Sequence, residues 1–338
     1  MPHKFNAGRR DKIPKQKYRV TNWAEYNEGL RRRGDLTDWI NEDALGLWSA
    51  PRRTTRGGQR RYSDLATELC LTLGVVFKQP LRQTQGLMRS IAKLLGVEIT
   101  VPDFSTLSRR GSGLPVSQQP ISRGGKPIHL TVDSTGLKIF GEGEWLEEKH
   151  KTKRKRRSWR KLHLGLDLNS GEIICSELTT QDVGDPTALP DMLDQIDGQV
   201  EQFTADGAYD GEPTCALLAA KFGPMVTVAI PPPKNAVMSS NATPEPTARD
   251  CHITEIANHG RMAWQKATGY NKCSRVETLM GRWKTVIGPK LKARDFENQR
   301  TEAKISVRVL KRMTGLGRPR FERTARNPSG EGRVPNCR

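Results

Sequence analysis

The chain has 338 residues and carries 56 Lys and Arg against 37 Asp and Glu, a formal net charge of +19. This excess excludes an acidic or neutral profile and makes a polyanion the first partner to consider. The length suggests about two domains. No stretch approaches the roughly 18 consecutive apolar residues of a membrane helix, and no apolar signal segment follows the N-terminus, so we expect neither.

The six cysteines form no Cys-x-x-Cys pair, and their spacing is irregular. We therefore expect free thiols in a reducing compartment. Zinc is the alternative for the group Cys251, His252, His259 and Cys273, but the spacing of this group fits no common finger pattern.

Helical patterns follow a basic N-terminal arm at residues 1–20. Asn22 and Glu25 have the spacing of a capping box and predict a helix that ends near Gly34, with a second short helix near 37–45. After a basic linker at 51–61, the apolar spacing predicts three more helices. They begin after Ser63 as cap, at Pro80 and near Pro102–Asp103.

The last of these three helices is short and displays hydroxyl and guanidinium groups, from Ser105, Thr106, Arg109 and Arg110. Two packed helices followed by such a helix fit a helix-turn-helix, although the pattern alone fits any small helical bundle equally well. Because the chain is strongly basic, we predict a helical DNA-binding domain over residues 21–110 with these four side chains at the DNA.

A linker rich in Gly, Ser and Pro at 111–127 precedes a region of different pattern. We expect strands at 128–140, at 159–179 as a hairpin around 169–171, at 202–206 and at 225–232, and helices at 185–196, 212–223, 253–266 and 271–286. Hairpins followed by alternating helices and strands predict a mixed α/β domain over 128–313, with helices on the faces of its sheet. Beyond it, we expect a basic disordered tail at 314–338.

Two aspartates in the predicted strands suggest chemistry. Asp133 interrupts an otherwise apolar and β-branched segment, although Asp is disfavoured in strands. Asp206 ends the strand at 202–206, where an α/β sheet presents functional groups. Each could instead be a turn-forming Asp, and Asp210 is a weaker rival to Asp206.

A third carboxylate, Glu277, lies on the predicted helix at 271–286. Tyr270, Glu277 and Lys284 are each seven residues apart and predict one stripe of that helix, while Arg275 and Arg282 predict a parallel basic stripe. The alternative is an ordinary solvated face. Three carboxylates from two strands and a helix can hold two divalent cations about 3.5–4 Å apart. Such a pair suits phosphodiester hydrolysis and transfer, and carboxylate oxygens suit Mg²⁺.

Five segments in order and spacing resemble bacterial insertion-sequence transposases of the DDE type, in the insertion sequence 5 group. They are LTVDSTGLKIFGEGEW (130–145), WRKLHL (159–164), TADGAYDG (204–211), GRMAWQKATGYN (260–271) and RVETLMGRWK (275–284). The resemblance runs from about residue 14 to residue 316. It implies an RNase H-like catalytic domain after an N-terminal DNA-binding region, with Asp133, Asp206 and Glu277 as the catalytic metal-binding triad.

The resemblance also implies partners and cofactors. We expect two Mg²⁺ ions, with Mn²⁺ tolerated, and double-stranded DNA as substrate, both as terminal inverted repeats and as target. The enzyme would free the 3′ ends by hydrolysis and join them to target DNA by transesterification. We expect a homodimer or larger assembly on DNA in the bacterial cytoplasm near the nucleoid, with no membrane and no small-molecule substrate.

One position departs from the family pattern. The last family motif runs Tyr, two residues, Arg, three residues, Glu, six residues, Lys, and here Cys273 holds the Arg position. A thiol cannot replace a guanidinium fork on DNA phosphate. The alternative is therefore a weakened or inactive copy that occupies DNA ends as a repressor. A third interpretation, a general RNase H-like nuclease, leaves the helical N-terminal region unexplained.

The run at 149–161 carries nine Lys and Arg and no acid. Like charges at this density repel one another unless a polyanion binds them, so we expect DNA contacts here rather than a solvated loop paired with the glutamates before it. The predicted contacts are Lys155, Arg156, Arg157, Arg160 and Lys161.

Overall fold

The computed structural model describes residues 17–40, 45–54, 56–116, 127–139, 159–239, 242 and 246–324. The chain forms two compact units, one from the described residues of segments 1–38 and 313–338, the other from 39–312. Within these described ranges, no helix is long and apolar enough to cross a membrane.

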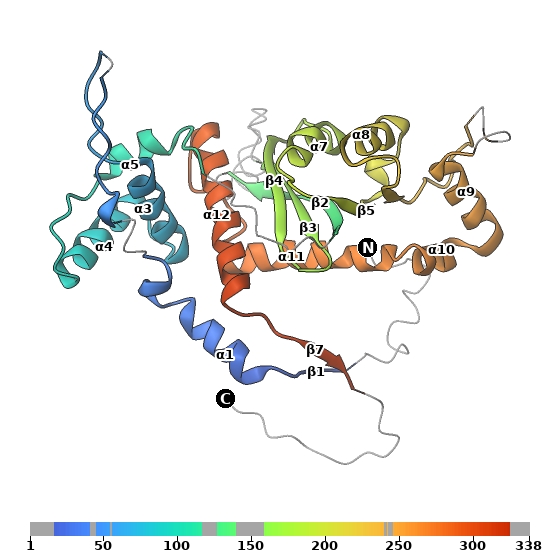
Figure 1. Cartoon of the computed structure of the whole chain (residues 1–338), viewed down its shortest axis with the longest axis horizontal. Coiled ribbons are helices and arrows are strands. Elements are labelled where there is room, and N and C mark those ends of the chain that lie inside the picture. The colour runs from blue at the N-terminus through green and yellow to red at the C-terminus, as the bar shows by residue number, and fades with distance from the viewer. Residues whose placement is uncertain are drawn as a thin grey trace, which may run out of the picture. The chain divides into compact units, whose positions relative to one another are not determined.

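The first unit joins the two ends of the chain. Its elements are β1 (Tyr18–Val20), α1 (Trp23–Arg32), a 3₁₀ turn at Leu36–Asp38 and β7 (Phe321–Arg323). Strands β1 and β7 pair antiparallel (Figure 1). The arm expected at residues 1–20 and the disordered tail expected at 314–338 thus each contribute a strand. Each strand forms its hydrogen bonds with the other end of the chain, and a local sequence pattern cannot reveal such pairing. The segments 1–16 and 325–338 lie outside the described residues.

The second unit begins with the three predicted helices, α3 (Asp64–Val76), α4 (Leu81–Leu94) and α5 (Phe104–Gly111). Ser63 Oγ accepts a hydrogen bond from the amide of Ala66 at 3.0 Å and so caps α3. Asp103 caps α5 by accepting from the amides of Ser105 and Thr106. The three helices are therefore confirmed at the predicted starts, whereas a helix-turn-helix stays a prediction. Of the short helix expected near 37–45, residues 41–44 lie outside the described residues.

A five-stranded sheet forms the centre of the second unit. Its strands are β2 (Ile128–Lys138), β3 (Trp159–Asp167), β4 (Ile173–Thr180), β5 (Val200–Thr204) and β6 (Thr227–Ala229). They lie in the order β4-β3-β2-β5-β6. The three strands β4, β3 and β2 form an antiparallel meander, and β5 and β6 continue parallel to β2. This mixed sheet confirms the α/β class and fits the RNase H-like domain that the resemblance implies.

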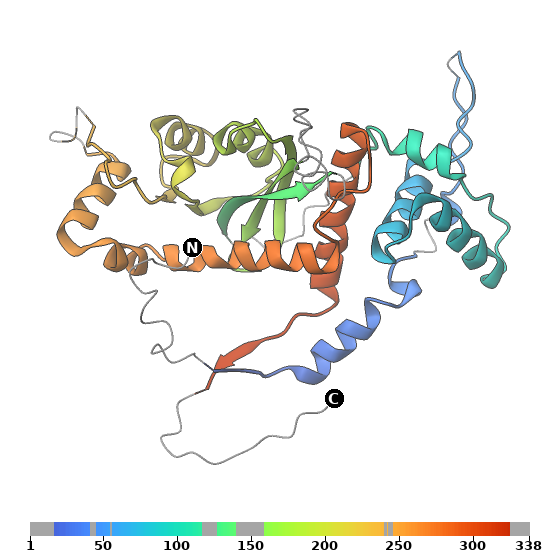
Figure 2. The ribbon, with the colours of Figure 1, turned by 180° about the vertical axis from the view of Figure 1, so that it is seen from behind.

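Helices cover both faces of this sheet (Figures 1 and 2). On one face, α7 (Asp185–Leu193) and α8 (Glu212–Phe222) bury an apolar cluster that includes Leu130, Val132 and Phe203. On the other face, α11 (Ser274–Val286) and α12 (Phe296–Leu316) bury a second cluster around Leu164 and Trp283. The sheet is therefore the middle layer of three.

The segment after β6 differs from its prediction in two places. The helix expected at 253–266 is two helices, α9 (Ala248–His259) and α10 (Arg261–Ala267). They are separated by Gly260, whose φ of 82° is open to glycine but strained for other residues. The helix expected at 271–286 begins only at Ser274, after a 3₁₀ turn at Tyr270–Cys273. Tyr270 therefore belongs to a different helical repeat from Glu277 and Lys284.

Candidate active site

Asp133 lies within β2, on the face of the sheet that α11 covers. Side chains of a strand alternate between faces. Leu130 and Val132 belong to the cluster under α7 and α8, while Leu137 belongs to the cluster under α11. Asp133 shares its face with Leu137, and its cross-strand partner Leu164 packs in the same cluster.

The parallel pairing of β5 with β2 brings Asp206 to the level of Asp133. Thr204, the last residue of β5, is the partner of Thr131, so two further residues along each chain place the aspartates side by side. The strand ends at Thr204 rather than at Asp206 as expected. Asp206 instead caps a 3₁₀ turn at Gly207–Tyr209 and accepts a hydrogen bond from the amide of Ala208 at 3.0 Å.

Glu277 approaches the two aspartates from α11. Its neighbours Val276, Leu279 and Met280 are buried against the strands, which fixes the rotation of the helix. Glu277 itself is exposed, in the first turn of the helix. Its charge contributes to the raised pKa of Asp133, so the two carboxylates interact electrostatically.

The aspartates at this site are held at an energetic cost. Burial, opposed by a hydrogen bond from the amide of Ser134, raises the pKa of Asp133 to about 6, and the charges of Asp206, Asp185 and Glu277 act in the same direction. Burial and the charge of Asp185 also raise the pKa of Asp206. A cation bound among these groups would relieve both effects.

Asp185 is a fourth carboxylate at the site, and sequence reasoning missed it. It is the first residue of α7, where an acidic residue is ordinary helix chemistry, so no sequence signal distinguished it. Its Oδ1 lies 3.1 Å from Nζ of Lys161 and 3.6 Å from Nδ1 of His163. Because burial lowers the pKa of His163 to about 4, Lys161 is the cation that balances Asp185 at neutral pH.

The donor atoms of the site bear on whether it can bind a divalent cation. In the described part of the chain, no three His, Cys, Asp or Glu side chains lie close enough together to hold an ion as they stand. The donor chemistry nevertheless fits a hard cation, since the donors are carboxylate oxygens and the raised pKa values of Asp133 and Asp206 reflect poorly compensated negative charge. A metal would have to draw Asp133, Asp206 and Glu277 closer together.

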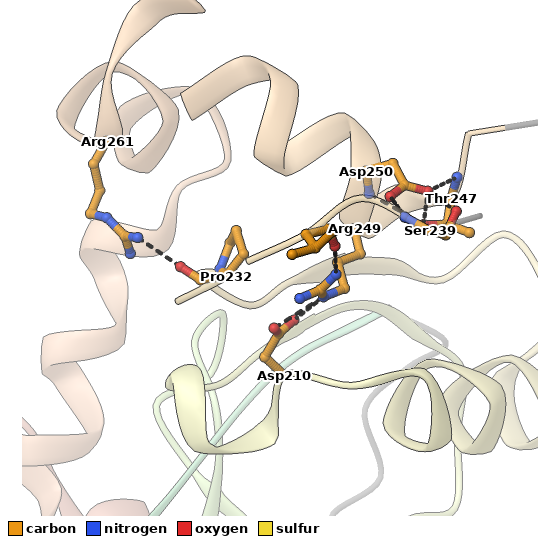
Figure 3. Close-up of polar contacts among 8 residues, drawn as sticks. Asp210, Pro232, Ser239, Thr247, Arg249, Asp250 and Arg261 are labelled. Atoms are coloured by element: carbon orange, nitrogen blue, oxygen red, sulfur yellow. Dashed lines mark hydrogen bonds and ion pairs between the residues drawn. The ribbon is translucent and has the colours of Figure 1, made fainter. Parts of the chain in front are cut away.

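Asp210, the rival to Asp206, has a different role. Its two carboxylate oxygens accept from Nε of Arg249 at 3.1 and 3.0 Å (Figure 3). Arg249 also donates to the carbonyl of Val237 at 2.8 Å. Asp210 is therefore neutralised by a cation of α9, and it does not contribute to the raised pKa of Asp133.

The side chains predicted to contact DNA on α5 are largely engaged within the protein. The hydroxyls of Ser105 and Thr106 donate to Asp103 at 2.6 and 2.8 Å. Arg110 is paired with Asp64 and donates to the carbonyl of Tyr62 at 2.9 Å. Arg109 is exposed and contacts Thr106 Oγ1 at 3.4 Å, which makes it the most available of the four for an external partner.

Other basic residues were predicted to contact DNA near the predicted triad, and their surroundings differ from one another. Arg275 donates to the carbonyl of Leu168 at 2.9 Å, and Arg282 donates to that of Leu310 at 3.3 Å. Arg160 donates to Gln299 at 2.9 Å, and its guanidinium stacks on Phe296. Lys155, Arg156 and Arg157 lie outside the described residues.

The two other residues of the predicted stripe have contrasting environments. Lys284 is exposed on α11, whereas Tyr270 is half-buried with its ring centroid 5.4 Å from that of Trp264. The charges of Asp206 and Asp133 help to raise the pKa of the Tyr270 hydroxyl, although burial is the larger cause. Tyr270 therefore lies beside the triad, but in a turn of its own.

Cys273 lies among the three predicted catalytic carboxylates. Burial raises the pKa of its thiol to about 12, and Asp133, Asp206 and Glu277 contribute in that order. The thiol is therefore neutral at physiological pH. An Arg at this position would bring a positive charge to the triad, which the neutral Cys273 does not supply.

Two family models match this chain. Residues 124–310 match a family model described as Transposase DDE domain. The chain belongs to the DDE transposase family. A second model with the same description matches residues 31–142, so the transposase match extends through the helical region into β2. A piggyBac transposase, solved by cryo-EM in a synaptic complex with hairpin DNA, aligns at 12% identity and a TM-score of 0.40, covering 89% of this chain and 78% of that chain.

Proposed function

We propose that this transposase cuts and joins DNA with divalent cations held by Asp133, Asp206 and Glu277. The observation that carries the proposal is the convergence of these residues. The β2–β5 register and the packing of α11 bring carboxylates that are far apart in sequence together at the middle of β2, next to the end of β5. There burial and mutual repulsion raise the pKa of Asp133. A family defined by DDE chemistry supplies the reaction class.

The proposed reaction is hydrolysis that frees the 3′ ends of the element, followed by transesterification into target DNA. Two Mg²⁺ ions, or Mn²⁺ in their place, would activate the attacking oxygen and stabilise the leaving 3′ oxygen. Asp133 would bind them from β2 and Asp206 from the start of the 3₁₀ turn after β5, and Glu277 would close the site from α11. Lys161 holds Asp185 and thereby keeps the fourth carboxylate from competing for the cations.

DNA would lie over the exposed side of the site formed by Asp133, Asp206 and Glu277. Among the described members of the predicted contact set, Lys284, Arg109, Arg275 and Ser105 are exposed, and Arg275 and Ser105 already make hydrogen bonds within the protein. The helical region would hold the terminal inverted repeats, and paired ends imply a dimer or larger assembly in a bacterial cytoplasm. We propose phosphate contacts for Lys284, where a point charge suffices.

The test is strand cleavage and joining by the purified protein on a plasmid that carries the gene's own flanking DNA. Wild type should cut at defined ends with Mg²⁺ or Mn²⁺. Asp133→Asn, Asp206→Asn and Glu277→Gln should each abolish cutting but retain end binding. A divalent cation should also raise the melting temperature of wild type and not that of Asp133→Asn, which reports binding without activity. Cleavage that survives Asp133→Asn would overturn the assignment.

Cys273 favours a second candidate function, a copy that binds DNA ends and represses active relatives. The family motif that the sequence resembles has Arg at this position, and the charges of Asp133, Asp206 and Glu277 help burial to raise the pKa of the Cys273 thiol, which supports a position close to these carboxylates. In that case wild type should bind ends without cutting them. If Cys273→Arg cuts DNA while wild type does not, wild type has an intact metal site that lacks only one guanidinium.

A further inference from the structure

The paired chain ends form a small basic ribbon. We define the terminal ribbon as β1, β7 and the flanking pairs Lys17 with Thr324 and Thr21 with Arg320. The flanking pairs extend the ladder, since the amide of Thr324 donates to the carbonyl of Lys17 at 3.1 Å and that of Thr21 to Arg320 at 2.9 Å. Asn22 fastens one end, because its side chain accepts from the amide of Arg320 at 2.7 Å and donates to the carbonyl of Arg318 at 3.0 Å.

The two faces of the terminal ribbon differ in chemistry. Cross-strand partners share a face. Tyr18 pairs with Arg323 and Val20 with Phe321, so one face carries two aromatic rings beside Val20 and Arg323, and Tyr18 and Phe321 are 58% and 62% exposed. Arg19 pairs with Glu322, so the opposite face carries Lys17, Arg19 and Arg320 against one acid.

These basic side chains are weakly compensated. Arg320 has only a 3.8 Å contact with Glu25, between side chains that are 72% and 59% exposed, and such surface pairs contribute little. Over the described residues, Lys17 and Arg19 make no side-chain hydrogen bond or ion pair. The segments that make up the first unit hold sixteen Lys and Arg against seven Asp and Glu in the sequence.

We propose that the terminal ribbon is a separate DNA-binding element that grips the phosphate backbone through Lys17, Arg19 and Arg320. A two-stranded ribbon has the width to enter the major groove of duplex DNA. Two strands alone are marginally stable in water, so a bound partner would reinforce them. Arginines on exposed strands oppose pairing with a further strand, which favours a polyanion over a second copy of the chain. The proposal rests on the DNA-binding part of the proposed function.

The experiment measures binding of the full chain to labelled duplexes by fluorescence anisotropy, with salt varied from about 50 to 200 mM. One duplex carries the element's end and the other an unrelated sequence. The triple variant Lys17→Gln, Arg19→Gln, Arg320→Gln should weaken binding to both duplexes alike. It should also lower the salt slope, the steepness with which the logarithm of the binding constant falls with the logarithm of the salt concentration, by about 3. Glu322→Gln removes the only acid from the same face and should tighten binding. The matched control is Arg31→Gln, which changes an exposed arginine of α1 outside the terminal ribbon. It should leave both the affinity for DNA and the salt slope unchanged.

An unchanged salt slope in the triple variant, with its circular dichroism intact, would overturn the proposal. A loss of self-association in analytical ultracentrifugation with DNA binding retained would do so as well, and would assign the ribbon to a second copy. Adding Asp133→Asn to the triple variant separates the two proposals, because the slope should fall whether or not the triad is intact. If wild type binds neither duplex, the proposed function itself fails.

Discussion

Nζ of Lys161 lies 3.1 Å from Oδ1 of Asp185 and donates to the carbonyl of Val183 at 2.9 Å. Lys161 was predicted to contact DNA, yet its ammonium is turned toward the base of α7. Asp185 is one of the charges that raise the pKa of both Asp133 and Asp206. The ion pair therefore limits the negative charge of the site while leaving the other carboxylates available.

Asp133 should make the stability of the metal-free transposase depend on pH. Its folded pKa of about 6 lies above the usual 3.8 because burial disfavours the charged form. This group therefore favours the folded state at low pH, and that contribution falls as pH rises from about 4 through 6. Thermal melts in chelator should show that Asp133→Asn gains stability relative to wild type at pH 7 but not near pH 4. An equal gain in stability at both pH values would contradict a raised pKa of Asp133.

The two aspartates of the segment 204–211 should differ sharply in function. Asp206→Asn should lose strand cleavage, because Asp206 stands level with Asp133. Asp210→Asn should keep it, because Asp210 is paired with Arg249 on α9. Asp210→Asn should instead lower the melting temperature, because it loses the ion pair, and Arg249→Gln should lower the melting temperature in the same way. Equal loss of cleavage in both aspartate variants, at equal folding, would argue against the register-based assignment.

Cys273→Arg should raise end cleavage above wild type, since a guanidinium there would attract DNA phosphate beside the triad. Cys273→Lys tests charge without the planar fork and should give a smaller gain. Cys251→Arg is the control for added charge elsewhere, because Cys251 is exposed on α9. Single-turnover cleavage and end affinity, measured separately, would show whether the gain lies in binding or in chemistry. A gain of equal size in Cys251→Arg would remove the special role of position 273.

Glu68 and Arg308 should couple energetically across α3 and α12. Glu68 is 8% exposed, and Arg308 is its ion-pair partner. Arg308→Met leaves a buried carboxylate unpaired and should lower the free energy of unfolding by about 3 kcal/mol. The double variant with Glu68→Gln should recover much of this loss, as measured by urea titration. An additive double-mutant cycle would show that the pair contributes no coupling.

Much of the local structure could be predicted from the sequence by itself. Ser63 and Asp103 mark helix starts through their side-chain oxygens, and the apolar and β-branched residues after Ile128 indicate a strand that Asp133 interrupts. These features depend on a few neighbouring residues. The resemblance of five short segments added the triad and the reaction class, and the family match confirms that the chain is a DDE-type transposase.

The tertiary structure decided everything that depends on partners distant in sequence. The pairing of Thr204 with Thr131 sets Asp206 level with Asp133, and the hydrogen bonds between β1 and β7 order the two ends of the chain. Asp185 and Asp210 are both ordinary acidic residues in sequence, yet one lies beside the triad and the other beside Arg249. The physical reason is that electrostatic and hydrogen-bond energies depend on distance in space, whereas the sequence pattern records only distance along the chain.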